Sequence, residues 1–271
     1  MAHTHSTSYG ESRLRMLRVL GRGDRHDPKD LTIALRLEGD GTAMVPGEAI
    51  KNLVHKIARD EDHPAIETLA LAMCARILTE HPAIRLARVE IVEHPWTRLE
   101  AGGKPQGQTF TPAGVERRTV TVTGNGSRTS ISAGIDNFVL LRTAGFAPRD
   151  RGRVSDEPTA DGLPRLFIAA LSARWSYSSG DIAFMPCRQG VRAAIAETFA
   201  WHKGPSAHDT LTSLAHVILE SYREISDVTL TLQERPYRPV DLLELALEDD
   251  ALFVARDEPI STLEIIVRRG E

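Results

Sequence analysis

The chain has 271 residues, a formal net charge of −4 and 41% apolar residues, which is enough to bury a core and ordinary for a globular protein. The negative charge gives no general attraction for nucleic acid or for an anionic membrane. No apolar run approaches the roughly 18–20 residues that span a bilayer, and the first residues lack the apolar segment of a signal peptide. The two distant cysteines favour reduced thiols. We expect a cytoplasmic protein without nucleic-acid or membrane partners.

The first half of the chain predicts the element order β-β-α-α-β-β. Alternating apolar and polar residues indicate strands, while proline at a first turn and helical spacing of apolar residues indicate helices. The expected strands are 13–20, 30–37, 84–96 and 115–123, and the expected helices are 46–59 and about 64–81. The polar segment 21–30 is expected to be a turn region.

The second half predicts the same order. The expected strands are 129–141, 165–177, 225–232 and 262–268, and the expected helices are 188–201 and 207–222. The segment 144–163, rich in Gly, Pro, Asp and Arg, is expected to be a long loop. This order predicts an α+β fold of two units, 8–125 and 126–271, each an antiparallel sheet with two helices on one face. We expect another subunit to cover the other face, which makes the protein a homo-oligomer.

Short motifs along most of the chain are similar to those of the urate oxidase (uricase) family. They are Tyr9-Gly10 with Arg13 and Arg15, Ile50-Lys51-Asn52, Val89-Glu90-Ile91, His94 with Trp96-Thr97-Arg98, the strand 132–141, Arg165, Ala173-Arg174-Trp175, Glu197-Thr198-Phe199-Ala200, and Tyr237 with Val240-Asp241-Leu242. The resemblance implies tandem tunnelling-fold (T-fold) units assembled into a tetramer, with sites between subunits. It also implies oxidation of urate with O2, without metal or organic cofactor, by a Lys–Thr–His proton relay.

The relay positions of that family hold other residues here. Glu11 stands at the position of the family's Lys, and Gly47-Glu48 stand at its Thr-Asp. Glu234 and Pro236 stand at its Asn and His. A urate anion would face three carboxylates at these positions, and like charges at short range cost several kcal/mol. Oxidation of urate by the relay of the family is therefore not expected.

The ring-binding positions are partly kept. Arg165 matches the arginine that grips the ring, Phe146 aligns with the stacking phenylalanine, and His208 stands at the position of the family's Gln. The resemblance thus assigns substrate binding to Arg165, His208 and Phe146. An ordinary alternative exists for each polar group, since Arg165 could form an ion pair within the chain and His208 could be a first-turn residue behind a Ser206 N-cap.

The replacements define a candidate chemistry. Glu11, Glu48, Glu234 and His208 form a general acid–base set, so we assign them as the catalytic candidates. His208, Glu234 and Glu11 also form a ligand set for a divalent metal such as Cu, Fe or Zn. The alternative for Glu48 is a solvated carboxylate that complements the dipole of its helix.

Three functions follow from this combination. The first is a uricase-like enzyme that oxidises a purine-like or other heteroaromatic ring with O2 in an inter-subunit pocket, metal-assisted or metal-free. The second is a non-catalytic binding or scaffold protein with the same fold. The third is a urate oxidase, forming 5-hydroxyisourate, whose proton relay has been altered. Fold analogy alone does not choose between them.

Overall fold

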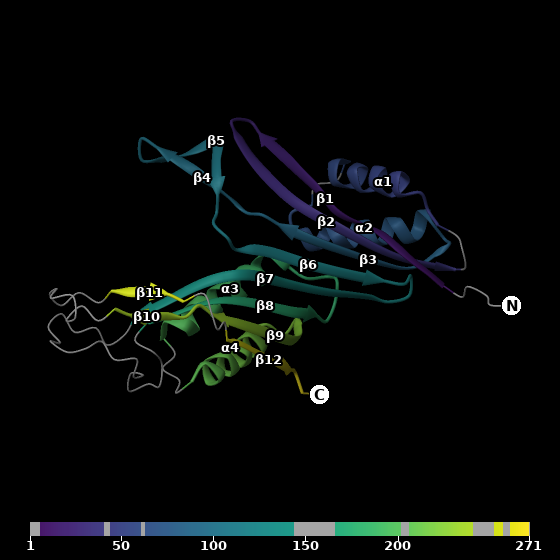
Figure 1. The fold of residues 1–271 in the computed structure, drawn as a ribbon. Helices are drawn as coiled ribbons and strands as arrows, with labels where there is room; N and C mark the ends of the chain where they lie inside the picture. Colours follow the sequence, from purple (N-terminus) through teal and green to yellow (C-terminus); the bar gives the residue numbers. More distant parts are fainter. Residues whose placement is uncertain are drawn as a thin grey trace. The chain divides into compact units, whose positions relative to one another are not determined.

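A computed structural model describes residues 6–40, 44–60, 63–143, 166–201, 206–240, 252–256 and 261–270. Contacts divide the chain into two compact units (Figure 1). Unit 1 comprises Met1–Asp136, Arg174–Arg188 and Glu224–Ser226, and unit 2 comprises Asn137–Ala173, Gln189–Arg223 and Asp227–Glu271. Three of the divisions fall inside strands and one inside a helix, and the expected boundary of the sequence repeat between 125 and 126 stays a prediction.

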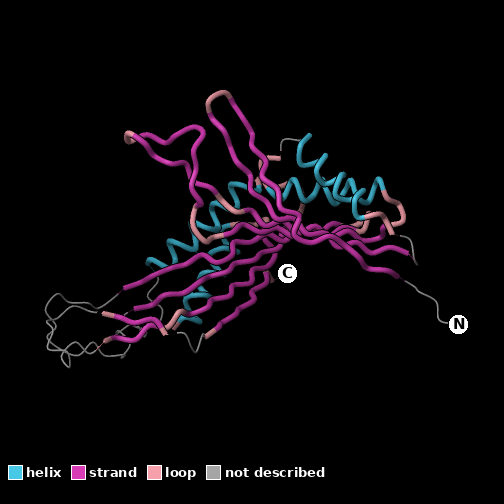
Figure 2. Tube along the Cα trace, turned by 45° about the horizontal axis from the view of Figure 1, so that its top comes forward, coloured by secondary structure: helices cyan, strands magenta, loops and turns pink. Residues whose placement is uncertain are grey.

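Unit 1 is an antiparallel sheet with a helix pair on one face. Its strands are β1 (Ser6–Arg22), β2 (Arg25–Asp40), β3 (Ile84–Glu93), β6 (Arg117–Gly124) and the first part of β7 (Thr129–Thr143), hydrogen-bonded in that spatial order. The helices α1 (Gly47–Asp60) and α2 (Ile66–Glu80), cyan in Figure 2, lie together on one side of these strands. Strand alternation places Ile33 of β2 and Ile91 of β3 in the core, where they are fully buried with Met73 of α2.

Unit 2 combines the end of β7 with β8 (Leu166–Tyr177), β9 (Ile225–Glu234) and β12 (Thr262–Arg268), in that order. Its helices are α3 (Phe184–Trp201) and α4 (Ala207–Ser221), of which α4 contacts β12. Ile195 of α3 and Leu230 of β9 are fully buried. Each unit therefore has its own apolar core between strands and helices.

The sequence prediction of a polar turn region at 21–30 is wrong in detail. The segment 21–30 is mostly strand, because β1 continues to Arg22 and β2 resumes at Arg25. Only Gly23 and Asp24 turn, with Gly23 at a φ of +62° that suits glycine. A long β-hairpin therefore replaces the expected polar linker.

The predicted strand 84–96 is also two elements. β3 ends at Glu93, and β4 (Trp96–Ala101) pairs with β5 (Lys104–Pro112) in a separate hairpin that the sequence did not predict. Pro95 lies between β3 and β4, and proline cannot donate a ladder hydrogen bond. A short pair, β10 (Tyr237–Pro239) with β11 (Phe253–Ala255), was missed as well.

The remaining elements agree with the predictions to within a few residues. α3 begins at Phe184 rather than at 188, because Pro186 sits in its first turn, where a missing N–H costs nothing. The predicted loop 144–163 lies outside the described residues. In the described part of the chain, no helix combines the length and apolar character needed to cross a bilayer.

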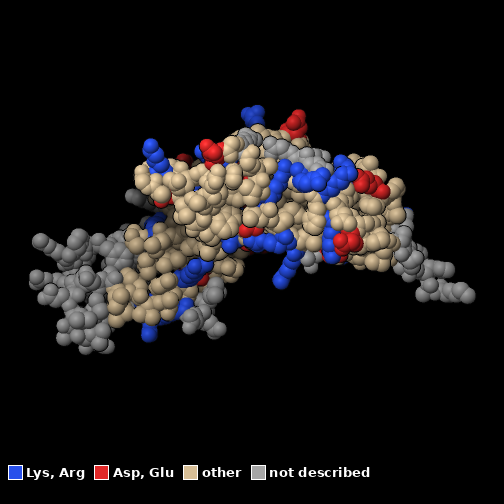
Figure 3. Space-filling view, turned by 90° about the horizontal axis from the view of Figure 1, so that it is seen from above, with Lys and Arg blue, Asp and Glu red and all other residues tan. Residues whose placement is uncertain are grey.

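The sheet face of unit 1 that points away from α1 and α2 is polar. On β6 the buried Val120 and Val122 alternate with Thr119, Thr121 and Thr123, which are only half-buried. Such a face tolerates water, so the expectation that a second subunit must cover it does not follow from hydrophobic burial. On the face of the molecule drawn in Figure 3, basic and acidic side chains likewise lie beside one another.

Candidate functional site

Glu11 lies on β1, directly opposite Leu35 of β2, and faces the first turn of α1. Its Oε2 atom lies 3.7 Å from Nζ of Lys51, and both side chains are about one third exposed. A Cβ atom added to Gly47 would overlap Oε1 of Glu11. The Glu11 carboxylate thus occupies the space that any side chain at position 47 would need.

Lys51 is a site residue that sequence reasoning missed as such. It belongs to the Ile-Lys-Asn motif, which indicated only the fold. Because residues one turn apart share a helix face, Gly47 and Lys51 both lie on the side of α1 that faces Glu11. The spacing of four was therefore an available signal, but only once β1 was known to run beside α1.

Glu48, in the same first turn of α1, is exposed. A carboxylate there complements the positive end of the helix dipole, which is the ordinary alternative for this residue. Glu11 and Glu48 are the only predicted catalytic residues that the described part of unit 1 contains. Glu11 faces the first turn of α1, and Glu48 belongs to that turn.

Glu234 ends β9 in unit 2 and is half-buried. Its N–H donates to the carbonyl of Ser261 at 2.9 Å, and the N–H of Arg235 donates to the carbonyl of Ile168 at 2.8 Å. These bonds hold the chain on both sides until Pro236 interrupts the strand. The segment is therefore both a turn and a fixed strand end.

Asn137 supports this strand end and was not identified from the sequence. It has a φ of 55°, which is uncommon for a residue other than glycine. Its N–H donates to Oγ of Ser172 at 3.4 Å, and its Oδ1 accepts a hydrogen bond from Arg235 at 3.4 Å. Residues held in such sparsely populated conformations cluster at functional sites.

His208 lies in the first turn of α4 and is exposed. Ser206 is the N-cap, and its Oγ accepts a hydrogen bond from the N–H of Asp209 at 3.1 Å. The capping role anticipated for Ser206 is therefore present. Arg165 and Phe146, the other two predicted substrate-binding residues, lie outside the described residues.

The predicted catalytic set is divided between the units. Glu11 and Glu48 belong to unit 1, whereas Glu234 and His208 belong to unit 2. Within the described ranges, no three His, Cys, Asp or Glu side chains form a group that could hold a metal ion. The metal set His208, Glu234 and Glu11 stays a prediction, since its members come from different units.

A second polar cluster lies on the polar sheet face of unit 1. Arg15 donates to Asp30 Oδ2 at 2.7 Å, and its Nη1 lies 2.8 Å from His94 Nε2. A guanidinium only donates, so Nε2 of His94 accepts, as a neutral imidazole does. Partial burial, with the charges of Arg15 and Arg117, lowers the pKa of His94 below 6.5, and Asp30 opposes this weakly.

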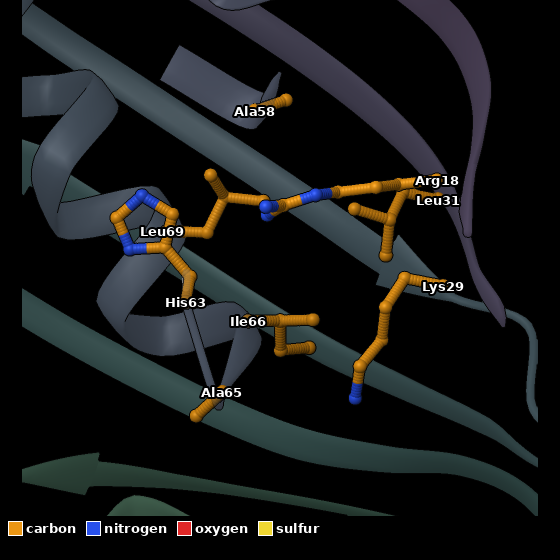
Figure 4. A pocket seen from close by; sticks show the side chains of 8 residues that line it. All are labelled: Arg18, Lys29, Leu31, Ala58, His63, Ala65, Ile66 and Leu69. Atoms are coloured by element: carbon orange, nitrogen blue, oxygen red, sulfur yellow. The ribbon is translucent and has the colours of Figure 1, made fainter. Parts of the chain in front are cut away.

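A small pocket lies between the hairpin of β1 and β2 and the helices of unit 1 (Figure 4). Arg18 and Lys29 line it from the strands, and His63 lines it from the segment before α2. Its free volume is about 20 Å³, which suits a water molecule. It is too small for a heteroaromatic ring.

Comparisons with known proteins identify the family of the chain. The uricase family model matches residues 22–123 and 131–264. The uricase of Danio rerio is 26% identical, with 93% of this chain and 90% of the relative aligned. The uricase of Oryctolagus cuniculus is 27% identical, with 97% of this chain and 93% of the relative aligned.

Solved uricase structures share the fold. The uricase from Arthrobacter globiformis superposes with a TM-score of 0.84 at 23% identity, covering 99% of this chain and 96% of that one. A uricase from Bacillus fastidious gives a TM-score of 0.75 at 15% identity, covering 97% and 93%. The expected α+β fold of tandem tunnelling-fold units is confirmed. Because the family model covers most of the sequence between residues 22 and 264, the chain belongs to the uricase family.

Proposed function

We propose that the protein is an oxidoreductase of uricase type that oxidises a purine-like or other heteroaromatic ring with O2, in a rebuilt pocket between subunits. The observation that carries the proposal is the family match over residues 22–123 and 131–264. The relatives are named uricases, and solved uricase structures share the fold of this chain.

The ionisable side chains of the candidate site are assigned to proton transfer. Glu11, Glu48 and Glu234 supply carboxylates for proton transfer, and His208 supplies an imidazole that can act as acid or base near neutral pH. Glu11 is paired with Lys51, and in this proposal its anchored carboxylate forms part of the pocket. An anionic urate ring is disfavoured there, whereas a neutral ring with N–H donors matches a group that only accepts hydrogen bonds.

Substrate binding is assigned to Arg165, His208 and Phe146. A guanidinium binds planar acceptors through two parallel hydrogen bonds, and a phenyl ring stacks on an aromatic face. Replacing Arg165 by Ala is expected to abolish ring binding. Unchanged binding of a confirmed ring would contradict the anchoring role.

The decisive experiment measures oxygen uptake by the purified, assembled protein over a panel of purines and related heterocycles. Each ring is tested without added metal and with Cu, Fe or Zn, because His208, Glu234 and Glu11 could ligate such an ion in an assembly. O2 consumption with a ring other than urate supports the proposal. Loss of urate absorbance with O2 uptake supports instead a urate oxidase with an altered relay.

A second candidate, a non-catalytic binding or scaffold protein, is favoured by one observation. Glu11 is paired with Lys51 and fills the space over Gly47, which suits a structural carboxylate as well as a catalytic one. Calorimetric binding of a ring without oxygen uptake under any metal condition would select this candidate and reject the enzyme.

The assembly is part of the proposal. We place the protein in the cytoplasm as a homotetramer in purine metabolism, with a small planar molecule and O2 as its partners. The described parts of β1 and β12 each have a strand neighbour on one side only, so two open edges remain for pairing. Native mass spectrometry tests the tetramer, and a monomer at micromolar concentration would reject it.

A further inference from the structure

The polar face of the unit 1 sheet contains a hollow of about 480 Å³. It lies over β3, β6, β7 and the end of β8, and all its lining residues belong to unit 1. Small-molecule sites have volumes of roughly 300–1,000 Å³, so the hollow is large enough for a ligand and not only for single waters. Of the predicted catalytic and ring-binding residues, those that the structure describes (Glu11, Glu48, Glu234 and His208) do not line it.

Six Ser and Thr side chains contribute hydroxyl groups to the lining. The strand register places Thr121 of β6 beside Ser132 of β7, and Thr123 beside Ser130. Ser176 of β8 adds a further hydroxyl. Each hydroxyl can donate one hydrogen bond. The Ser130 hydroxyl donates to the carbonyl of Thr123 at 3.4 Å, so Thr121 and Ser132 are the neighbouring pair that the proposal uses as donors to a ligand with several acceptor oxygens.

Four charged side chains line the hollow, namely Arg88, Glu90, Asp136 and Arg174. Arg88 donates to Glu90 at 2.6 Å, which neutralises both groups. Asp136 stands opposite Arg117 in the pairing of β6 with β7. Arg174 of β8 also lines the hollow and is exposed, and its side chain forms no hydrogen bond or ion pair with another residue in the described ranges. Two arginines and two carboxylates therefore line the hollow, and the Arg174 guanidinium is available to a ligand.

We propose that this hollow binds a small oxyanion, a carboxylate or phosphate group, through Arg174 and the neighbouring Ser and Thr hydroxyls. The planar guanidinium matches two oxygens of either group at once. The hydroxyls donate hydrogen bonds to the remaining oxygens of the ligand. A purely apolar ligand would leave these donors without an acceptor. This site is independent of the proposed oxidation, and it is proposed to bind the anion without catalysing a reaction.

Calorimetric titration of the full-length, assembled protein with inorganic phosphate and with malonate tests the proposal. Potassium chloride at matched ionic strength controls for general screening. Saturable binding of either anion is expected, weaker at higher salt, and a preference between the two distinguishes a phosphate ligand from a carboxylate ligand. Absence of saturable binding of both anions overturns the proposal.

Variants test the assignment to Arg174. Arg174→Gln is expected to weaken binding about tenfold or more, the usual effect of a lost charge-assisted hydrogen bond. Arg174→Lys keeps the charge without the planar fork and should weaken binding less. Arg36→Gln is the matched control, because Arg36 is an exposed strand arginine outside the lining. Equal affinity in Arg174→Gln and wild type, or equal loss in Arg36→Gln, overturns the site.

Thr121→Val provides a readout that does not depend on the charge. It preserves the shape of the side chain and removes one hydroxyl donor. A moderate loss of affinity with an unchanged thermal midpoint is expected. Should Arg174→Gln fail to fold, unaltered anion affinity in Thr121→Val and Arg174→Lys together would contradict the proposal.

Discussion

Arg188, in the first turns of α3, donates a hydrogen bond to Glu67 of α2 inside unit 1, and both side chains are almost completely buried. Burial raises the pKa of Glu67 above 4.5, although the Arg188 guanidinium acts in the opposite direction. Oε2 of Glu67 and Nε of Arg188 have no hydrogen-bond partner within the described residues. The pair therefore joins two distant chain segments at a considerable desolvation cost.

Breaking this pair from one side should be strongly destabilising. Glu67→Ala leaves a buried guanidinium without its counter-ion, so the free energy of unfolding should fall by about 3–5 kcal/mol. Urea unfolding at neutral pH measures the change. The exposed pair of Arg88 and Glu90 is the control, and Glu90→Ala should cost less than about 1 kcal/mol. The double variant Glu67→Met/Arg188→Met should regain most of the loss; a double variant as unstable as Glu67→Ala would contradict this account.

The His94 cluster predicts a pH dependence. The pKa of His94 is lowered in the folded protein, so the unfolded chain binds a proton more readily. Stability should therefore fall as the pH drops below about 6.5, through the lowered folded pKa. His94→Gln removes this titration, so its urea midpoint should vary less between neutral and mildly acidic pH. Parallel curves for wild type and His94→Gln would exclude the contribution of His94.

The fit of Glu11 over Gly47 predicts a coupling between the two positions. Gly47→Ala should force the Glu11 side chain away from Lys51 and destabilise the protein, although alanine is normally the better helix residue by about 0.5–1 kcal/mol. In a Glu11→Ala background the same change should be neutral or stabilising. A double-mutant cycle by thermal unfolding should give a coupling of roughly 0.5–3 kcal/mol. Strict additivity would mean that Glu11 does not occupy this space.

The β4–β5 hairpin depends on a close approach to the turn of the β1–β2 hairpin. Arg98 donates to the carbonyls of Gly107 and His26 and lies 4.9 Å over the ring of Phe110. A Cβ atom on Gly107 would overlap the carbonyl oxygen of Asp24, which cannot move as a side chain can.

Gly107→Ala should therefore lower the free energy of unfolding by about 1–3 kcal/mol. Gly21→Ala is the control, since a Cβ atom there makes only ordinary contacts with His26. Hydrogen exchange of the hairpin amides should show faster exchange in Gly107→Ala than in Gly21→Ala. Equal protection in the two variants would argue against the close approach.

The sequence predicted the elements whose signals are local. Large apolar residues, among them the buried Ile33 and Ile91, recur at every second position, and Met73 lies in an apolar helical pattern, so β2, β3 and α2 were all found. The β4–β5 hairpin was missed because its residues are mostly exposed and its prolines weaken the strand pattern. Glu67 and Arg188 are far apart in the sequence and meet only in the folded protein. Such a pair produces no periodic pattern in the sequence.

The candidate site was predictable only in part. Family motifs indicated Glu11, Gly47 and Glu48 by position, and the structure places them at one end of α1. The role of Lys51 depends on the approach of β1 to α1, and that of Asn137 depends on its left-handed backbone conformation. Neither is encoded in the spacing of residue types.

The overlap between a side chain at position 47 and the carboxylate at position 11 also restricts how related sequences can vary. In this conformation a glutamate at position 11 requires glycine at position 47, because a Cβ atom there would overlap Oε1 of Glu11. Among uricase-family sequences, glutamate at the first position should then occur with glycine at the second. Glycine at position 47 places no such demand on position 11, so it should also occur with other residues there.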